Sequence, residues 1–360
     1  MKAIRLAGMA FIVAACLGGF RAAAADEACG PIGDLGFVCG PANSEDLVQV
    51  PGTTWIVAGG MAGGAAETRG GLHLIDSVDK FSTILFPDGN PRVLWDRATY
   101  GDCPGPPDLA KFSAQGLDLR SGTGSTSTLY VVNHGGRQSI ELFSLDTKQS
   151  EPAVVWIGCV VMPAHTWPHS VAPFPDGGMV ITSTYDHGDP SYSEKLADGA
   201  DTGAVYEWHP HQGFTLVPGS QLSGNKGIEV SRDGKWIYIA AWGNKAVVRL
   251  GRGEGASGKR DVLPAGFLVD NLRWGSDGQL IVTGQNAAAA EVLSCFQSVA
   301  PRCTQPWRID RWDTRAMTLR PVASKPGNSE FGGATVGLQM GADMFVGTFR
   351  GDRIAYFSLK

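Results

Sequence analysis

A single strand-and-turn unit recurs six times along the chain, and this repeat constrains the fold more than any other feature of the sequence. In its clearest copy, residues 227–241, two apolar runs flank the dipeptide Asp233-Gly234, and a third run follows at 246–250. Asp-Gly between alternating apolar residues is a strong β-hairpin signal. The other five units cover 46–57 with 72–75, 116–132 with 140–143, 171–183 with 204–208, 272–283 with 308–312, and 335–348 with 353–357.

The repeat predicts an all-β protein, a six-bladed β-propeller with four-stranded antiparallel blades. Residues 26–360 supply about 56 residues per unit, against roughly 40–50 in propeller repeats, so we assign the surplus to longer loops. The 49 Gly and 21 Pro fit a chain with many turns. A two-sheet sandwich is the alternative, but it seldom repeats strand, turn, strand, loop and strand so regularly. Beyond residue 25 the sequence shows almost no helical periodicity.

The N-terminus has the pattern of a secretory signal peptide. Lys2 and Arg5 precede an apolar run over 6–16, and small residues continue to Ala25. This run is too short to cross a bilayer, and no later stretch is long and apolar enough to do so. We expect cleavage before Asp26 and a single propeller domain over 26–360 that is secreted or periplasmic. A lipobox-like run ending at Cys16 leaves open a lipid anchor in the outer membrane.

The net charge and the cysteine content indicate which partners the chain can bind and the redox environment in which it folds. Residues 1–25 carry three cations and no acid, so the formal charge of −5 becomes −8 after cleavage. An acidic domain repels phosphate backbones, and we expect no nucleic-acid partner. Six cysteines remain, an even number that favours disulfides in an exported chain. The predicted pairs, one of 15 possible sets, are Cys29–Cys39, Cys103–Cys159 and Cys295–Cys303.

Propeller topology predicts which polar residues meet at one mouth of the central channel. The starts of the first strands and the loops after the second strands converge there, and such a concave mouth is the default site. The strand starts contribute Glu45, Gln115, His169, Asn225, Lys226, Asp270 and Asn271, and the loops contribute His134, Asp186, Trp242, Gln285 and Asn286. At strand ends, Asp and Asn can instead simply make turn hydrogen bonds.

Four short stretches resemble the paraoxonases: 129–134 with 140–143, 267–272, 43–47 and 227–234. The wider group includes gluconolactonase-like and strictosidine-synthase-like propellers. The resemblance implies a six-bladed propeller whose channel calcium polarises a lactone or ester carbonyl while a histidine activates water. It places Glu45, Asp270 and Asn271 at calcium-ligand positions and His134 at an active-site histidine.

The sequence departs from that pattern at three positions. Gln115 stands where the family has a second histidine, and His169 and Lys226 stand at asparagine ligand positions. Imidazole is a poor calcium ligand, and an ammonium cannot be a ligand. Asn225 could supply the missing oxygen; alternatively, the Lys226 ammonium takes the place of calcium and pairs with Glu45 and Asp270. His169 could be a base, a transition-metal ligand or a structural donor.

The sequence therefore predicts a hydrolase for a small-molecule lactone or ester. The candidate catalytic residues are His134 as general base, His169, and Lys226, which would polarise the carbonyl if calcium is absent. The candidate substrate-binding residues are Gln115, Asp186, Trp242, Gln285 and Asn286, and the candidate metal ligands are Glu45, Asn225, Asp270 and Asn271. The alternatives are a propeller that binds a small ligand or partner without turnover, and metal-free carbon–carbon bond chemistry with Glu45 or another acid as base.

Overall fold

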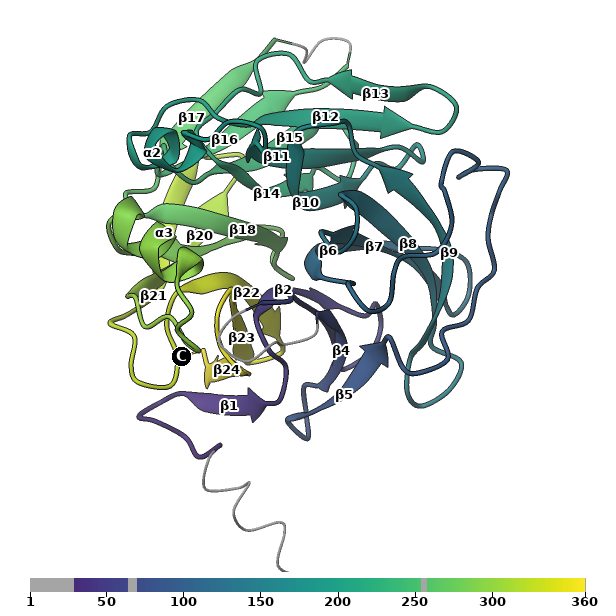
Figure 1. The fold of residues 1–360 in the computed structure, drawn as a ribbon. Coiled ribbons are helices and arrows are strands. Elements are labelled where there is room, and N and C mark those ends of the chain that lie inside the picture. The colour runs from purple at the N-terminus through teal and green to yellow at the C-terminus, as the bar shows by residue number, and fades with distance from the viewer. Residues whose placement is uncertain (1–28, 64–69, 254–257, 360) are drawn as a thin grey trace, which may run out of the picture.

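The computed structural model describes residues 29–63, 70–253 and 258–359. The predicted signal peptide, its cleavage site and Cys16 lie outside the described residues. The described chain forms six four-stranded antiparallel sheets arranged as a ring around a central channel (Figure 1). The predicted six-bladed propeller is therefore confirmed.

The blades are numbered here in chain order. Blade 1 contains β2 (Ser44–Gln49), β3 (Trp55–Gly60), β4 (Gly71–Asp76) and β5 (Phe81–Phe86). Blade 2 contains β6 (Ala114–Ser121), β7 (Thr126–Asn133), β8 (Ser139–Asp146) and β9 (Ala153–Val161). Blade 3 contains β10 (Thr166–Pro173), β11 (Met179–Asp186), β12 (Ala204–His209) and β13 (Gly213–Leu216). Blade 4 contains β14 (Asn225–Val230), β15 (Trp236–Ala241), β16 (Ala246–Gly251) and β17 (Arg260–Pro264). Blade 5 contains β18 (Leu268–Trp274), β19 (Leu280–Gln285), β20 (Trp307–Asp313) and β21 (Thr318–Lys325). Blade 6 contains β22 (Ala334–Met340), β23 (Asp343–Thr348), β24 (Arg353–Ser358) and, as its outer strand, β1 (Gly36–Cys39).

The ring is closed by strands from both ends of the described chain. β1 pairs antiparallel with β24, with Gly36 opposite Tyr356 and Cys39 opposite Arg353. The six inner strands β2, β6, β10, β14, β18 and β22 contact one another in that order, and β22 returns to β2. A sheet-to-sheet ring of this kind leaves only short edges exposed at the periphery.

Local sequence accounts for each hairpin. In blade 4, Gly234 has φ +69°, a left-handed conformation that Gly adopts without steric cost, and the turn brings Val230 opposite Ile237. Alternate residues then face the neighbouring blade: Ile228 and Ile239 are fully buried in a cluster with Val205 of blade 3. Each blade thus buries its apolar face against the next blade.

Two short helices were not predicted by the sequence. α2 (Tyr192–Ala197) follows β11, and α3 (Ala289–Gln297) follows β19, each in a long connection after a second strand. Helices this short are stabilised mainly by packing rather than by propensity, and Leu196 and Val292 are their buried residues. Neither described helix has the length and hydropathy needed to span a membrane.

The three predicted disulfides are all present. Cys29–Cys39 joins the segment before β1 to the end of that strand, Cys103–Cys159 ties the loop before β6 to β9, and Cys295–Cys303 closes the end of α3 onto the loop before β20. Structural disulfides are typical of proteins from oxidising environments.

A buried arginine joins four inner strands inside the channel. Arg273 of β18 is 3% exposed, and its Nε donates to the Leu47 carbonyl of β2 at 2.8 Å. Its Nη2 donates to the Leu117 carbonyl of β6 at 2.6 Å and to the Asp46 carboxylate. Its Nη1 donates to Glu229 of β14 at 3.1 Å. Removing one partner from such a buried pair typically costs about 3–5 kcal/mol.

Burial raises the pKa values of the carboxyl groups around Arg273. Desolvation raises the pKa of Asp46 to about 7, although Arg273 opposes the shift, and it raises the pKa of Glu229 well above its usual value. A raised native pKa means that the native state holds a proton that the unfolded chain releases. The resulting stability is complete below the unfolded pKa, about 4.3 for Glu, and is lost as the pH rises through the native pKa.

We therefore predict that Glu229→Gln flattens the pH dependence of stability. Glutamine keeps an oxygen that accepts from Arg273 but cannot ionise. Between pH 5 and pH 8 the variant should lose less unfolding free energy than the native protein, because it has no proton to release at this position. Urea unfolding at both pH values measures this, with the exposed Glu194→Gln as control. If the unfolding free energy changes equally between pH 5 and pH 8 in the native protein and in Glu229→Gln, the prediction is wrong.

Candidate functional site

Each inner strand carries a β-bulge at the same level of the channel. The ladder between first and second strands shifts register at the equivalent position in all six blades. The residues inside the six irregular steps are Glu45, Gln115–Gly116, His169–Ser170, Lys226–Gly227, Asp270–Asn271 and Thr335. A bulge leaves a residue unpaired and redirects its side chain, which is why bulges recur beside functional sites. The bulges therefore direct one ring of polar side chains into the channel.

Glycines allow these inner strands to approach closely. A Cβ atom on Gly116 would lie 2.2 Å from the His169 carbonyl oxygen, and one on Gly227 would lie 2.7 Å from the Asn271 Cα. Any side chain at either position would push neighbouring blades apart. The tight ring brings residues far apart in sequence into contact at the channel floor.

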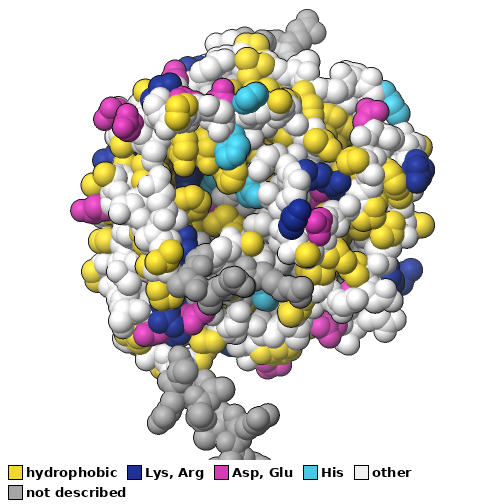
Figure 2. All heavy atoms as spheres, in the orientation of Figure 1, with side chains coloured by type: hydrophobic (Ala, Val, Ile, Leu, Met, Phe, Trp, Pro, Cys, Tyr) yellow, Lys and Arg dark blue, Asp and Glu magenta, His cyan; other side chains and the backbone are white. Residues whose placement is uncertain are grey.

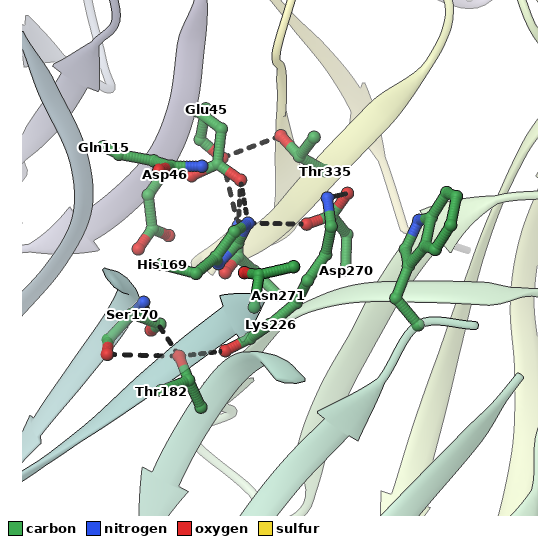
Figure 3. Close-up of polar contacts among 12 residues, drawn as sticks. Glu45, Asp46, Gln115, His169, Ser170, Thr182, Lys226, Asp270, Asn271 and Thr335 are labelled. Atoms are coloured by element: carbon green, nitrogen blue, oxygen red, sulfur yellow. Dashed lines mark hydrogen bonds and ion pairs between the residues drawn. The ribbon is translucent and has the colours of Figure 1, made fainter. Parts of the chain in front are cut away.

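Four ionisable side chains converge at this floor (Figure 3). His169 Nε2 lies 3.2 Å from Glu45 Oε1 and 3.3 Å from Asp270 Oδ1, without hydrogen-bond geometry to either oxygen. The Lys226 ammonium lies 2.8 Å from Asp270 Oδ2. Glu45, His169 and Asp270 are almost fully buried, and Lys226 is partly exposed to the cavity. Two carboxylates thus face one ammonium and one imidazole.

Neighbouring polar groups hold the two carboxylates in place. Asn271 donates to Glu45 Oε1 at 3.0 Å, whereas Glu45 Oε2 is buried and has no hydrogen-bond partner among the described residues. Gln285 donates to Asp270 Oδ2 at 2.8 Å and accepts from the Trp242 indole at 2.8 Å. Glu45 lines the cavity as a residue, and its buried Oε2 is an acceptor without a partner among the described residues.

The charges at the floor shift two pKa values. Burial by itself disfavours the charged form of His169, but the Glu45 and Asp270 carboxylates raise its pKa above the usual value. Burial likewise opposes ionisation of Asp270, but Lys226 and His169 outweigh it and lower its pKa to about 2. The geometry thus favours an imidazolium at His169 and a carboxylate at Asp270.

An apolar cavity with a water-accessible volume of about 60 Å³ lies above this floor. Apolar side chains surround the hollow at the centre of the ring (Figure 2). The floor is formed by Glu45, Gln115, His169 and Lys226, and the walls by Met61, Trp167, Thr184, Tyr185, Tyr192, Leu196, Trp242, Val292, Leu293, Phe296, Gln297 and Phe349. A mostly apolar pocket with a few convergent polar groups is the usual form of a small-molecule site.

A stack of aromatic rings forms one wall. The Trp167 ring stacks on Tyr185 at a centroid distance of 5.6 Å, and Tyr185 stacks on Tyr192 of α2 at 4.0 Å. α2 and α3 meet over the cavity, where Gln297 donates to Ser193 at 3.1 Å. This helical roof was not predicted, because the predicted site included strand ends only. The signal in the sequence was the length of the two connections, 187–203 and 286–306.

The structure brings together six of the predicted residues. Glu45, Gln115, His169, Lys226 and Trp242 line the cavity, and Asp270 lies directly behind it. Gln285 and Asn271 do not line the cavity but position Asp270, Trp242 and Glu45. Lys226 pairs with Asp270, as the ion-pair hypothesis proposed, but no contact links it to Glu45 among the described residues.

Three predicted residues lie away from the cavity and require correction. Asn225 does not turn toward the metal-ligand group: its amide donates to the Ser220 carbonyl at 2.8 Å. Asp186 is exposed and accepts from the Gly188 amide, and Asn286 is also exposed.

His134 is placed beside the site rather than inside it. Its Nδ1 lies 2.6 Å from Gln138 Oε1, its Nε2 contacts the Gln115 side chain, and its ring stacks on Trp167 at 4.3 Å. Desolvation lowers the pKa of His134 to about 4, so the ring is neutral at pH 7. With both nitrogens engaged, the geometry gives His134 the part of a residue that orients Gln115 and Trp167.

Glu45, His169 and Asp270 could hold a metal ion, because they place one ligand atom each within 4.8 Å of one another. Calcium prefers six to eight oxygen ligands. This group offers two carboxylates and an imidazole, and one carboxylate already pairs with the Lys226 ammonium. The donor set therefore fits calcium poorly, whereas mixed nitrogen and oxygen ligands suit divalent transition ions.

Solved structures share the fold. A gluconolactonase from Xanthomonas campestris superposes with a TM-score of 0.53 at 14% identity, covering 93% of this chain and 92% of that one. A luciferin-regenerating enzyme superposes with a TM-score of 0.53 at 12% identity, covering 89% of this chain and 92% of that one. The PQQ-bound aldose sugar dehydrogenase of Streptomyces coelicolor superposes with a TM-score of 0.50 at 12% identity, covering 92% of this chain and 100% of that one.

The sequence matches no protein-family model and no curated protein. At 12–14% identity the structural likeness establishes the fold alone. It agrees with the six-bladed propeller that the resemblance implied, and the chemistry has to be argued from the residues of the site.

The raised pKa of His169 can be measured directly. We predict that its Cε1–H signal titrates above pH 6.5, the ordinary midpoint for histidine, in chelator-treated protein. Its stabilising contribution is present below that value and is lost as the pH rises through the native pKa. Asp270→Asn removes one carboxylate and should lower the midpoint. Proton–carbon NMR, with His169→Gln to assign the signal, provides the measurement; a midpoint below 6.5 in the native protein would contradict it.

Proposed function

We propose that this protein hydrolyses a small-molecule lactone or ester in the channel-mouth cavity. The observation that carries the proposal is the combination of a free carboxylate oxygen, Glu45 Oε2, with the Lys226 ammonium at the floor of one apolar cavity. Hydrolysis of a carbonyl compound needs a base for water and a positive group for the developing oxyanion. Both groups are present on one floor.

The proposed reaction uses the residues of the floor in order. A water bound to Glu45 Oε2 gives its proton to that carboxylate and attacks the carbonyl carbon. The Lys226 ammonium, held by Asp270, stabilises the negative charge on the carbonyl oxygen. When the tetrahedral intermediate collapses, the carbon–oxygen bond to the leaving alcohol breaks, and the protonated Glu45 returns the proton to it.

The walls favour a substrate with an apolar ring. Trp242 and Phe349 line the cavity, as do the stacked rings of Trp167, Tyr185 and Tyr192. Aromatic side chains offer a large contact area to a flat apolar group. An aryl lactone or aryl ester matches these walls better than a polyhydroxylated sugar lactone.

Binding without turnover is the second candidate. His134, the predicted base, has both ring nitrogens engaged with glutamines. Lys226 and His169 also balance the two carboxylates of the floor. A charge-balanced floor of this kind is compatible with a cavity that only holds its ligand.

We propose in addition that the chain is exported. The N-terminal pattern of Lys2, Arg5 and the apolar run has the form of a signal peptide. Three disulfides support an oxidising destination, such as the periplasm or the exterior of the cell.

Glu45→Gln should reduce kcat/KM for dihydrocoumarin or phenyl acetate by about 100-fold or more, the usual contribution of general-base catalysis. His134→Gln should cost less than about tenfold, because His134 only orients neighbouring groups. Product acid is measured by pH-stat titration, with δ-gluconolactone as the sugar comparison and Glu194→Gln as control. If no ester or lactone is turned over while the aryl lactone still binds, the hydrolase proposal fails and the binding role stands.

Calcium is tested separately. The Lys226 charge beside Asp270 opposes a divalent cation, so chelator-stripped protein should show no one-site calcium binding below millimolar concentration. Lys226→Asn removes this charge and adds an oxygen donor, and should strengthen calcium affinity by about tenfold or more. Calorimetry measures both, with the exposed Lys111→Asn as control. Tight binding to the native protein that Asp270→Ala abolishes would instead place calcium at the floor.

A further inference from the structure

Arg350 is a buried arginine without an acidic partner. It follows β23, is 8% exposed, and donates from Nη2 to the Phe296 carbonyl at 2.7 Å. Its Nε and Nη1 are also buried and have no hydrogen-bond partner within the described part of the chain. Two donor groups of one guanidinium are thus left unsatisfied.

The other buried arginines of the described chain are paired differently. Arg273 contacts the Asp46 and Glu229 carboxylates, and Arg353 lies 3.0 Å from Glu330. For Arg350, no carboxylate of the described residues lies within ion-pair distance. Burial lowers its pKa, and no neighbouring charge offsets that effect. Burying an uncompensated charge is costly, so an unpaired guanidinium calls for a reason.

Capping of α3 explains only part of this arrangement. The Phe296 carbonyl belongs to the last turn of α3, where a cation is favourable because of the helix dipole. That contact uses one Nη2 hydrogen and leaves the Nε and Nη1 hydrogens free. A lysine or a backbone donor could cap the helix equally well without burying further donors.

Arg350 does not itself line the cavity but lies next to two residues that do. Its chain neighbour Phe349 and its hydrogen-bond partner Phe296 both line the cavity, with their rings 5.9 Å apart. The Arg350 carbonyl accepts from the Cys303 amide at 3.3 Å, and the Cys295–Cys303 disulfide links that loop to α3. Arg350 is therefore fixed where the wall of blade 6 meets the helical roof.

We propose that Arg350 is the anion-recognition residue of this cavity, and that the ligand is an apolar, ring-containing molecule that carries a carboxylate. Arginine presents donors in a planar fork that matches a carboxylate. The apolar body of the ligand packs against Phe296 and Phe349, and a small displacement of Phe296 on α3 admits the carboxylate to the free donors. The inference concerns the cavity of the proposed function but requires binding only, not hydrolysis.

The test compares an acid with its neutral isostere. Phenylacetate and phenylacetamide differ in charge but hardly in shape, and tryptophan fluorescence at 50 mM salt reports binding through Trp167 and Trp242 of the wall. The native protein should prefer phenylacetate by at least tenfold. Arg350→Met should abolish this preference and leave phenylacetamide affinity unchanged, whereas Arg350→Lys should keep part of it. The exposed Arg315→Met serves as control.

Several outcomes overturn the inference. The inference is wrong if the native protein binds phenylacetate and phenylacetamide with equal affinity. It is also wrong if Arg350→Met keeps the preference for phenylacetate, in which case Arg350 only caps α3. A preference lost in Lys226→Met but kept in Arg350→Met would move anion recognition to the channel floor. The Glu45→Gln variant should retain the preference, so failure of the hydrolase proposal is distinguishable from failure of this one.

Discussion

The hydrogen bonds of the buried Arg273 guanidinium hold the centre of this propeller together. A propeller has no covalent or secondary-structure link across its channel, so its inner strands need another means of fixing their distance. Arg273 provides one by donating to the backbone carbonyls of Leu47 and Leu117 and to carboxylates on β2 and β14. The same strand that is fixed by Arg273 also carries Asp270, which pairs with Lys226, and Asn271, which donates to Glu45.

Above Arg273, the β-bulges of the inner strands direct polar and ionisable side chains into the channel. In a regular ladder, residues of each inner strand would alternate between the two blade faces. The register shifts instead direct Glu45, His169, Lys226 and Asp270 toward one point. Gly116 and Gly227 allow the strands to approach closely enough for these side chains to touch. The site is therefore a product of backbone irregularity repeated with the symmetry of the blades.

The floor of the cavity differs from a simple cation-binding site because positive or protonatable side chains lie beside its two carboxylates. Two carboxylates without counter-charges would attract a divalent ion, but Lys226 occupies one oxygen of Asp270 and the His169 ring lies between the two acids. Positive charge is thus built into the protein. The same fold also occurs in a PQQ-bound sugar dehydrogenase, so the fold alone does not determine the chemistry of a site, which depends on the residues at its floor.

The sequence by itself determined the blades, because each hairpin depends on residues within about a dozen positions of one another, such as the turn at Asp233-Gly234. It also predicted the three disulfides, as one of 15 possible sets of pairs, and the convergence of strand starts at one mouth. Only the tertiary structure decided which side chains touch. Asn271 reaches Glu45 across 226 residues, and Arg273 reaches Asp46 across 227. The direction of Asn225, the contacts of His134, the packing of the helical roof and the surroundings of Arg350 among the described residues likewise depend on bulges and on contacts between elements far apart in the sequence.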